Sequence, residues 1–333
     1  MVADRIITIS DDKYGLPYSK GIMASTIMPT GLSPRQAYDV ARKIEELLLS
    51  AEKYVVSLDE LHCLTHLLLQ KEIGREYARR YAEWMAIKTL KRPIILLIGG
   101  TTGVGKSTMA VEAAHRLAIT RVVSTDSIRE VMRSILSKDL LPALYESTYL
   151  AYRSLRLPYP SLTDPLIAGF REQVGAVAVG IQAVIDRSVR EAAHTVIEGI
   201  HVVPGFINID IPLERAVIVP IIMVAEDPLR HKSHFYIRDI ETSGMRSVNR
   251  YQKYFENIRR IGEYIEELAD EYGFAKISSL NIDTAVLNIL DFTMSRVSVS
   301  PGVKSSADEF EERCSHWQEG EVGRRITSLI TGR

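Results

Sequence analysis

The segment from Gly100 to Ser107 has the residue types and the spacing that bind nucleotide phosphates. It reads Gly-Thr-Thr-Gly-Val-Gly-Lys-Ser, which matches a glycine, four residues of any type and then Gly-Lys-Ser/Thr. The glycines allow the backbone to fold back so that its N–H groups form an anion-binding nest. We expect Lys106 to reach the β- and γ-phosphates and the Ser107 hydroxyl to coordinate Mg²⁺. The predicted nucleotide-binding residues are Gly100, Thr101, Thr102, Gly103, Val104, Gly105, Lys106, Ser107 and Thr108.

The segments on either side of this loop have the character that the motif requires. Residues 94–98 form the apolar run Ile-Ile-Leu-Leu-Ile, which predicts a buried strand, and residues 108–117 have the composition of a helix. A helix that begins directly after the loop places the positive end of its dipole beneath the bound phosphates. The sequence therefore predicts a nucleotide-binding site.

Two acidic residues follow other expected strands. Asp126 comes after the apolar residues 121–124, and Glu198 comes after residues 194–197. In an open α/β sheet, ligands gather at the carboxyl ends of the strands. We expect Glu198 to hold Mg²⁺ through water and Asp126 to orient or deprotonate an acceptor hydroxyl. The alternative, in which Glu198 is the base, stays open at the level of the sequence. The predicted catalytic residues are Lys106, Asp126, Glu198 and Arg238.

Arginine residues near Asp126 indicate an anionic acceptor. In a helix that begins there, Asp126, Arg129 and Arg133 lie at positions i, i+3 and i+7 on one face. Guanidinium groups bind phosphate and carboxylate oxygens in pairs. Arg171 and His201 are further predicted substrate contacts, although His201 also fits a structural role in the turn that follows it.

A second group of basic residues lies between residues 226 and 273. Phosphoryl transfer spreads negative charge over the equatorial oxygens, and arginines on a mobile lid stabilise that charge and exclude water. We expect Arg238 or a neighbour to act in this way. The basic residues of the expected lid are Arg230, His231, Lys232, His234, Arg238, Arg246 and Arg250.

Short apolar runs that alternate with helical patterns predict an α/β fold with a parallel sheet sandwiched by helices, of the P-loop kinase type. The expected strands are residues 93–98, 121–124, 194–197, 216–225 and 274–278. The first ninety or so residues predict a separate, mainly helical domain, with helix starts at Ser33-Pro34, Ser57 and Gly74. We therefore expect domains at 1–90 and 91–300, and a tail of uncertain order at 301–333.

Composition excludes several classes of protein. The chain has 333 residues, and 41 Lys and Arg against 42 Asp and Glu give a net charge of −1. Such a balance provides no field that would attract nucleic acid or an anionic membrane. No apolar run approaches the roughly 20 residues that span a bilayer. The two cysteines, Cys63 and Cys314, are too few for a disulfide framework and suit a reducing cytoplasm. The sequence leaves a homo-oligomer open.

Beyond the phosphate-binding loop, the region from about residue 91 to residue 295 resembles the archaeal 2-phosphoglycerate kinases. The segments that carry the resemblance are STDSIRE at 124–130, AGFREQV at 168–174, IEGIHVVPGF at 197–206 and HKSHFYIRD at 231–239. The resemblance implies transfer of the ATP γ-phosphate to the 3-hydroxyl of 2-phosphoglycerate, which gives 2,3-bisphosphoglycerate and ADP. In methanogens that product is the precursor of cyclic 2,3-bisphosphoglycerate.

The N-terminal region is similar to an ATP-cone, a regulatory nucleotide-binding module. The similar segments are LPYSKGIMAS at 16–25, SLDELH at 57–62 and GREYARRY at 74–81. Its opening reads Asp12-Lys13-Tyr14-Gly15, whereas a Lys-Arg-Asp-Gly-like turn is usual in that family. This leaves two alternatives, a domain that binds a regulatory nucleotide and one that only packs against the kinase domain.

Two rival functions fit the same residues. The first is a kinase of another anionic alcohol, such as an inositol phosphate, and the second is a sensor that binds ATP and transfers nothing. The presence of both Asp126 and Glu198 argues against the sensor, because a protein that only binds ATP requires neither acid.

Overall fold

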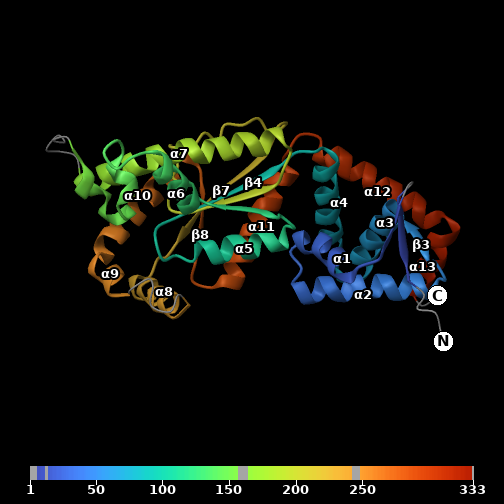
Figure 1. Cartoon of the computed structure of the whole chain (residues 1–333). Coiled ribbons are helices and arrows are strands. Elements are labelled where there is room, and N and C mark those ends of the chain that lie inside the picture. The colour runs from blue at the N-terminus through green and yellow to red at the C-terminus, as the bar shows by residue number, and fades with distance from the viewer. Residues whose placement is uncertain (1–5, 12–13, 157–163, 242–247, 332–333) are drawn as a thin grey trace. The chain divides into compact units, whose positions relative to one another are not determined.

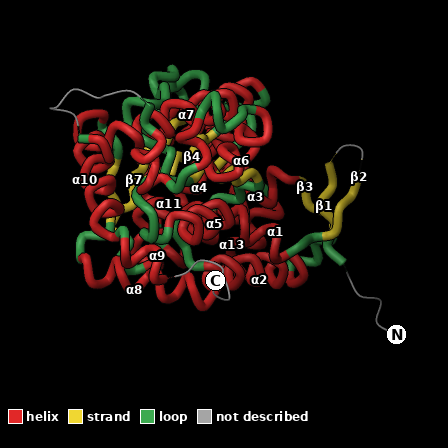
Figure 2. The backbone as a smooth tube through the Cα atoms, turned by 60° about the vertical axis from the view of Figure 1, so that its left-hand side comes forward, coloured by secondary structure: helices red, strands yellow, loops and turns green. Residues whose placement is uncertain are grey.

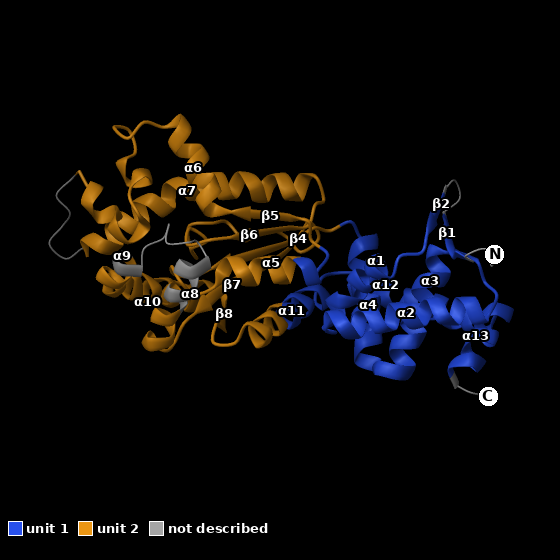
Figure 3. Ribbon diagram, turned by 60° about the horizontal axis from the view of Figure 1, so that its bottom comes forward, with its two compact units in different colours: residues 1–91, 115–118, 290–333 blue, residues 92–114, 119–289 orange. Residues whose placement is uncertain are grey.

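The computed structural model describes residues 6–11, 14–156, 164–241 and 248–331; for residues 11, 14, 234, 236–241, 248–250 and 331 the backbone alone is described. The chain forms two compact units, which Figure 3 shows in different colours. Unit 1 consists of Met1–Lys91, His115–Ala118 and Leu290–Arg333, and unit 2 consists of Arg92–Ala114 and Ile119–Ile289. In the described residues, no helix is long and apolar enough to cross a bilayer.

Unit 2 contains a parallel sheet of five strands, as the alternating pattern predicted. The strands are β4 (Ile94–Gly99), β5 (Arg121–Ser124), β6 (Thr195–Glu198), β7 (Val217–Val224) and β8 (Ala275–Ser278). Their order across the sheet is β5-β6-β4-β7-β8, and every neighbouring pair is parallel. All residues of β4, β6 and β7 are buried, because helices cover both faces of a parallel sheet.

Helices lie on both faces of this sheet, with α7 on one face and α5 on the other (Figure 1). The helices of this part of the chain are α5 (Lys106–Arg116), α6 (Thr125–Ile135), α7 (Pro165–Arg190), α8 (Pro228–Glu241), α9 (Val248–Lys253) and α10 (Phe255–Tyr272). Helix α11 (Ile282–Ser298) begins in unit 2, and its residues from Leu290 onward belong to unit 1. Two 3₁₀ helices, Pro142–Tyr145 and Thr148–Ser154, precede α7. The side chain of Asp164 caps the first turn of α7, and Pro165 occupies its first position.

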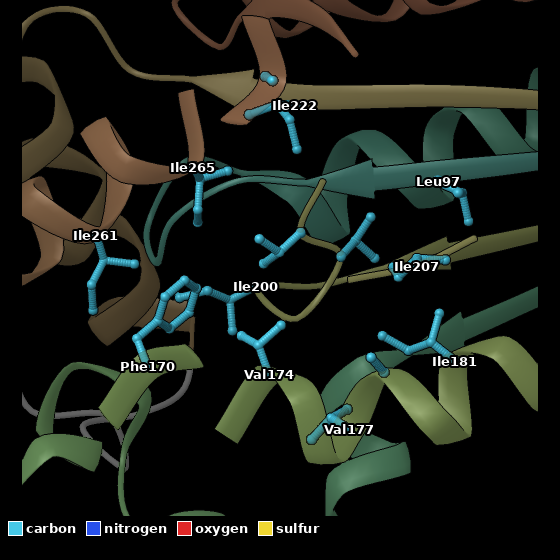
Figure 4. Packing of buried hydrophobic residues seen from close by; sticks show 14 of the residues in the cluster. Leu97, Phe170, Val174, Val177, Ile181, Ile200, Ile207, Ile222, Ile261 and Ile265 are labelled. Atoms are coloured by element: carbon cyan, nitrogen blue, oxygen red, sulfur yellow. The ribbon is translucent and has the colours of Figure 1, made fainter. Parts of the chain in front are cut away.

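A continuous apolar core fixes α7 and α10 against the sheet (Figure 4). Phe170, Val174, Val177 and Ile181 recur on α7 at helical spacing and are all fully buried. Because burial of each such side chain contributes about 1.5–3 kcal/mol, this stripe sets the rotation of α7 about its axis. Gln173, next to Val174, is thereby turned into the interior with an exposed fraction of 0%.

Unit 1 combines a small sheet with helices. The strands β1 (Thr8–Asp11), β2 (Tyr14–Pro17) and β3 (Val55–Ser57) pair in the order β2-β1-β3 and lie side by side in Figure 2. The helices are α1 (Lys20–Ile27), α2 (Pro34–Ser50), α3 (Leu58–Leu68), α4 (Arg75–Thr89), α12 (Val303–Glu319) and α13 (Glu321–Thr331). Ser33 and Ser57 form capping boxes with Gln36 and Glu60, as the predicted helix starts required.

The C-terminal segment, expected to be a tail of uncertain order, belongs to unit 1. Four buried residues of α12, namely Val303, Ala307, Phe310 and Cys314, lie along one stripe of the helix. Cys314 is bonded to Cys63 on α3, at a separation of 251 residues in the sequence. The two cysteines, expected to be reduced, therefore form a disulfide bond. Because 251 residues separate them in the sequence, no local pattern predicts this bond.

Reduction of the Cys63–Cys314 bond is expected to destabilise unit 1 by about 2–5 kcal/mol, because a cross-link over a long loop restricts the unfolded chain. Trp84 and Trp317 are the two tryptophans of the chain, and both lie in unit 1. Urea unfolding followed by tryptophan fluorescence, with and without dithiothreitol, measures the effect. The variant with both Cys63→Ser and Cys314→Ser is the control and should be insensitive to the reductant. An unchanged midpoint in fully reduced wild-type protein would contradict the expectation.

Candidate active site

The phosphate-binding loop connects β4 to α5, in the strand–loop–helix context that the motif requires. Gly100, Gly103 and Gly105 have φ angles of +127°, +88° and +75°, which side chains other than glycine rarely adopt. Lys106 is buried, and its Nζ donates a hydrogen bond to the carbonyl oxygen of Thr101 at 2.6 Å. Ser107 follows at the start of α5 and is exposed. The loop thus has the backbone shape of a phosphate cradle.

Residues of α8 and α10 support the outer side of the loop. The Thr101 hydroxyl donates to the carbonyl of Ile258 at 2.8 Å, and the His231 Nε2–H donates to the carbonyl of Thr102 at 2.8 Å. A Cβ atom at Gly103 would lie 2.5 Å from the Phe235 ring. His231 is fully buried, so this residue of the expected lid holds the loop from within the core.

Glu198 lies between the ends of two neighbouring strands. Its register partners are Ile98 on β4 and Ser124 on β5. Only 6% of Glu198 is exposed, and its Oε2 accepts a hydrogen bond from the Ser107 hydroxyl at 3.1 Å. The structure therefore brings together the two residues that the sequence assigned to Mg²⁺.

The oxygen atoms of Ser107 and Glu198 fit a magnesium ion, because Mg²⁺ takes one or two protein ligands and completes its shell with phosphates and water. The described residues contain no group of three or more His, Cys, Asp or Glu side chains that could hold a metal ion. An ion at this edge would therefore depend on the nucleotide, as is usual in phosphoryl transfer.

Asp126 occupies the first turn of α6, directly after β5. Its backbone N–H donates to the hydroxyl of Ser124, which caps the helix, and its side chain is exposed. Arg129 and Arg133 follow on the same helix, and their Nε atoms are buried without a hydrogen-bond partner among the described residues. The Arg133 guanidinium lies over the Tyr145 ring at 4.9 Å and pairs with Glu130 at 2.7 Å.

His201 lies in the interior with an exposed fraction of 0%. Both of its ring nitrogens are in hydrogen bonds, Nδ1 with Thr125 at 3.0 Å and Nε2 with Gln173 at 3.2 Å. Burial lowers the pKa of His201 to about 3, against the opposing effect of the Asp126 carboxylate. The imidazole is consequently neutral at physiological pH.

The remaining predicted residues lie elsewhere or outside the described atoms. Arg171 is exposed on α7, hydrogen-bonds the Tyr264 hydroxyl and lies over the Phe206 ring at 5.2 Å. Arg230 pairs with Asp227 at 3.7 Å. Outside the described residues lie Arg246 and the side chains of His234, Arg238 and Arg250.

Sequence reasoning missed Thr125, whose buried hydroxyl is hydrogen-bonded to His201. A sequence signal for a close approach at this point was Gly199, which follows Glu198 at the end of β6. Gly199 has a φ of +145°, and a Cβ atom there would lie 1.8 Å from the Thr125 hydroxyl. A glycine is thus required where the start of α6 approaches the end of β6.

Comparison with known proteins places this arrangement in a family. The chain is 41% identical over 293 residues to the 2-phosphoglycerate kinase of Methanopyrus kandleri, a match that covers 88% of each chain. The chain belongs to the 2-phosphoglycerate kinase family. Family relatives in Methanothermobacter thermautotrophicus and Pyrococcus furiosus are each 39% identical, over 90% and 91% of this chain and 96% and 97% of their own. These matches cover more residues than unit 2 contains, so they include part of unit 1.

No family model and no solved structure matches the chain. The assignment to the 2-phosphoglycerate kinase family therefore rests on the named relatives.

Gly199→Ala is expected to destabilise the protein by about 2–5 kcal/mol, through strain at positive φ and collision with Thr125. Gly175→Ala on α7 is the matched control, because a Cβ atom at Gly175 would have no neighbouring atom within 4 Å. That control should stabilise the protein by about 0.5–1 kcal/mol, as alanine favours a helix. Urea unfolding followed by circular dichroism measures the free energy of unfolding of both variants. Equal effects of the two substitutions would contradict the close approach of Gly199 to Thr125.

Proposed function

We propose that the protein transfers the γ-phosphate of ATP to the 3-hydroxyl of 2-phosphoglycerate, giving 2,3-bisphosphoglycerate and ADP. The observation that carries the proposal is the contact between Ser107 and Glu198 at the strand edge, with Asp126 on the adjoining helix, in a chain of this family. The product would supply the cyclic bisphosphoglycerate of methanogens, and the reaction would take place in the cytoplasm.

In this proposal the residues of the loop bind the nucleotide. Backbone N–H groups from Gly100 to Ser107 surround the phosphates, and Lys106 exchanges its bond to the Thr101 carbonyl for phosphate oxygens. Ser107 and Glu198 would hold Mg²⁺, which would neutralise charge on the β- and γ-phosphates. Arg238, on α8, is proposed to contact the transferred phosphoryl group.

The acceptor would lie against α6. Its 3-hydroxyl gives its proton to the Asp126 carboxylate as the oxygen forms a bond to the γ-phosphorus, and the bond from that phosphorus to ADP breaks. The acceptor carries a carboxylate and a phosphate, which match the guanidinium groups of Arg129 and Arg133. Arg171 is proposed as a further contact with these charges.

For the N-terminal part of the chain we propose an ATP-cone-like module. Its described strands and helices include a parallel and an antiparallel pairing of β1 and the capped helices α2 and α3. The Asp12-Lys13 part of the opening turn lies outside the described residues. Lys20, in the segment LPYSKGIMAS that resembles the ATP-cone, pairs with Glu45 at 2.7 Å.

The test is ADP release from Mg-ATP with a panel of acceptors. The panel contains 2-phosphoglycerate, 3-phosphoglycerate, glycerate, an inositol phosphate and a nucleoside. Turnover with 2-phosphoglycerate well above all others is expected, because only that acceptor combines a free primary hydroxyl with a phosphate and a carboxylate on the neighbouring carbon.

Lys106→Ala is the control, and it should abolish turnover with every acceptor. Turnover confined to an inositol phosphate would favour the kinase of another anionic alcohol. Binding of ATP without turnover of any acceptor would favour the sensor and contradict the proposed kinase.

A further inference from the structure

A chain of buried hydrogen bonds connects the start of α6 to the interior of α7. Its members are Thr125, His201 and Gln173, each with an exposed fraction of 0%. Asp126, the proposed base, directly follows Thr125 in the first turn of α6. The proposed reaction does not use these three side chains, although buried polar groups are costly unless they are fully hydrogen-bonded.

The direction of each hydrogen bond follows from Gln173. Its amide nitrogen donates to the carbonyl oxygens of Ala143 and Glu146, so its amide oxygen faces His201 and accepts. His201 Nε2 therefore carries the ring proton, and Nδ1 accepts the hydroxyl proton of Thr125. Every donor among these three side chains has an acceptor, so the direction of each hydrogen bond is fixed.

The charged groups around His201 leave its ring neutral. Burial is the main cause that lowers its pKa, the Arg129 and Lys106 cations add to this effect, and the Asp126 carboxylate opposes it. These groups come from α6 and from the end of the phosphate-binding loop, so both parts of the proposed site contribute to the electrostatic surroundings of His201. A neutral, fully enclosed ring has no surface on which to bind an anionic substrate.

The first turn of α6 carries both the Thr125 hydroxyl, which belongs to these hydrogen bonds, and the Asp126 carboxylate. The N–H of Asp126 donates to the Ser124 hydroxyl at 3.2 Å, and the Asp126 side chain is exposed. Its carboxylate is therefore placed by the first turn of the helix. The Thr125 hydroxyl, one residue before Asp126, is hydrogen-bonded to His201 at the point where Gly199 allows β6 to approach.

We propose that His201 is a positioning residue, which holds Asp126 in place for phosphoryl transfer through the hydroxyl of Thr125. This inference rests on the proposed function, since it requires Asp126 to be the base. It assigns to His201 a role in the interior in place of the substrate contact expected from the sequence.

The test is a double-mutant cycle with Thr125→Val and Asp126→Asn. Valine has the shape of threonine without the hydroxyl, and Thr125→Ser, which keeps the hydroxyl, is the matched control. Thr125→Val is expected to lower kcat about 10- to 100-fold, the cost of a displaced catalytic group, with the KM for ATP unchanged. In the Asp126→Asn background the same substitution should change kcat less than about 2-fold.

The outcomes distinguish a role of Thr125 in positioning Asp126 from a role in the stability of the fold alone. Near-normal kcat in Thr125→Ser together with a non-additive cycle would support the proposal. The same fold-loss from Thr125→Val in both backgrounds, or normal kcat in Thr125→Val, would overturn it. Full activity of Asp126→Asn would overturn the base assignment and the positioning role with it.

A second measurement does not depend on turnover, so it separates failure of this inference from failure of the proposed kinase. In ¹⁵N spectra of the histidine rings, the His201 signal is identified by its loss in His201→Gln. We expect a neutral ring protonated at Nε2 that stays neutral at pH 5, with a shifted Nδ1 signal in Thr125→Val. Titration of His201 near its ordinary pKa of about 6.5, or an Nδ1 signal unaffected by Thr125→Val, would overturn the proposal.

Discussion

The parallel register of three strands is the constraint on which the active site depends. Pairing of β6 with β4 and with β5 places Glu198 beside Ile98 and Ser124. From these strand ends the chain continues into the phosphate-binding loop and into α6. A shift of one residue in the pairing would reverse the side chains of β6 and remove Glu198 from Ser107. The hydrogen bond between these two residues therefore reports the correct assembly of the sheet.

Much of the fold was predictable because it rests on local patterns. The strands β4 and β7 are apolar runs, and the helix starts at Ser33 and Ser57 are capping sequences, so each could be recognised in a short window. The chain order also indicated that the two acidic residues follow strands. The order of the strands across the sheet, which places Glu198 of β6 between β5 and β4, is a long-range property that no local window contains.

The features that sequence reasoning missed are contacts between distant segments. The Cys63–Cys314 bond depends on the packing of α12 against α3, and α12 has only a narrow apolar stripe among charged residues. His231 lies in a basic segment that was expected to form a mobile lid. It is instead buried and donates a hydrogen bond to the carbonyl of Thr102. In both cases the burial of a side chain is decided by its three-dimensional neighbours.

The most direct test of the proposed division of roles compares Glu198→Gln with Asp126→Asn in ATP binding and in turnover. The account predicts that Glu198→Gln loses the strengthening of ATP binding by Mg²⁺ and, as a result, loses turnover. It predicts that Asp126→Asn binds Mg-ATP like the wild type but loses turnover by about 100-fold or more, the typical contribution of a general base. Full turnover in Asp126→Asn, with normal Mg-ATP binding and no turnover in Glu198→Gln, would contradict it and make Glu198 the base.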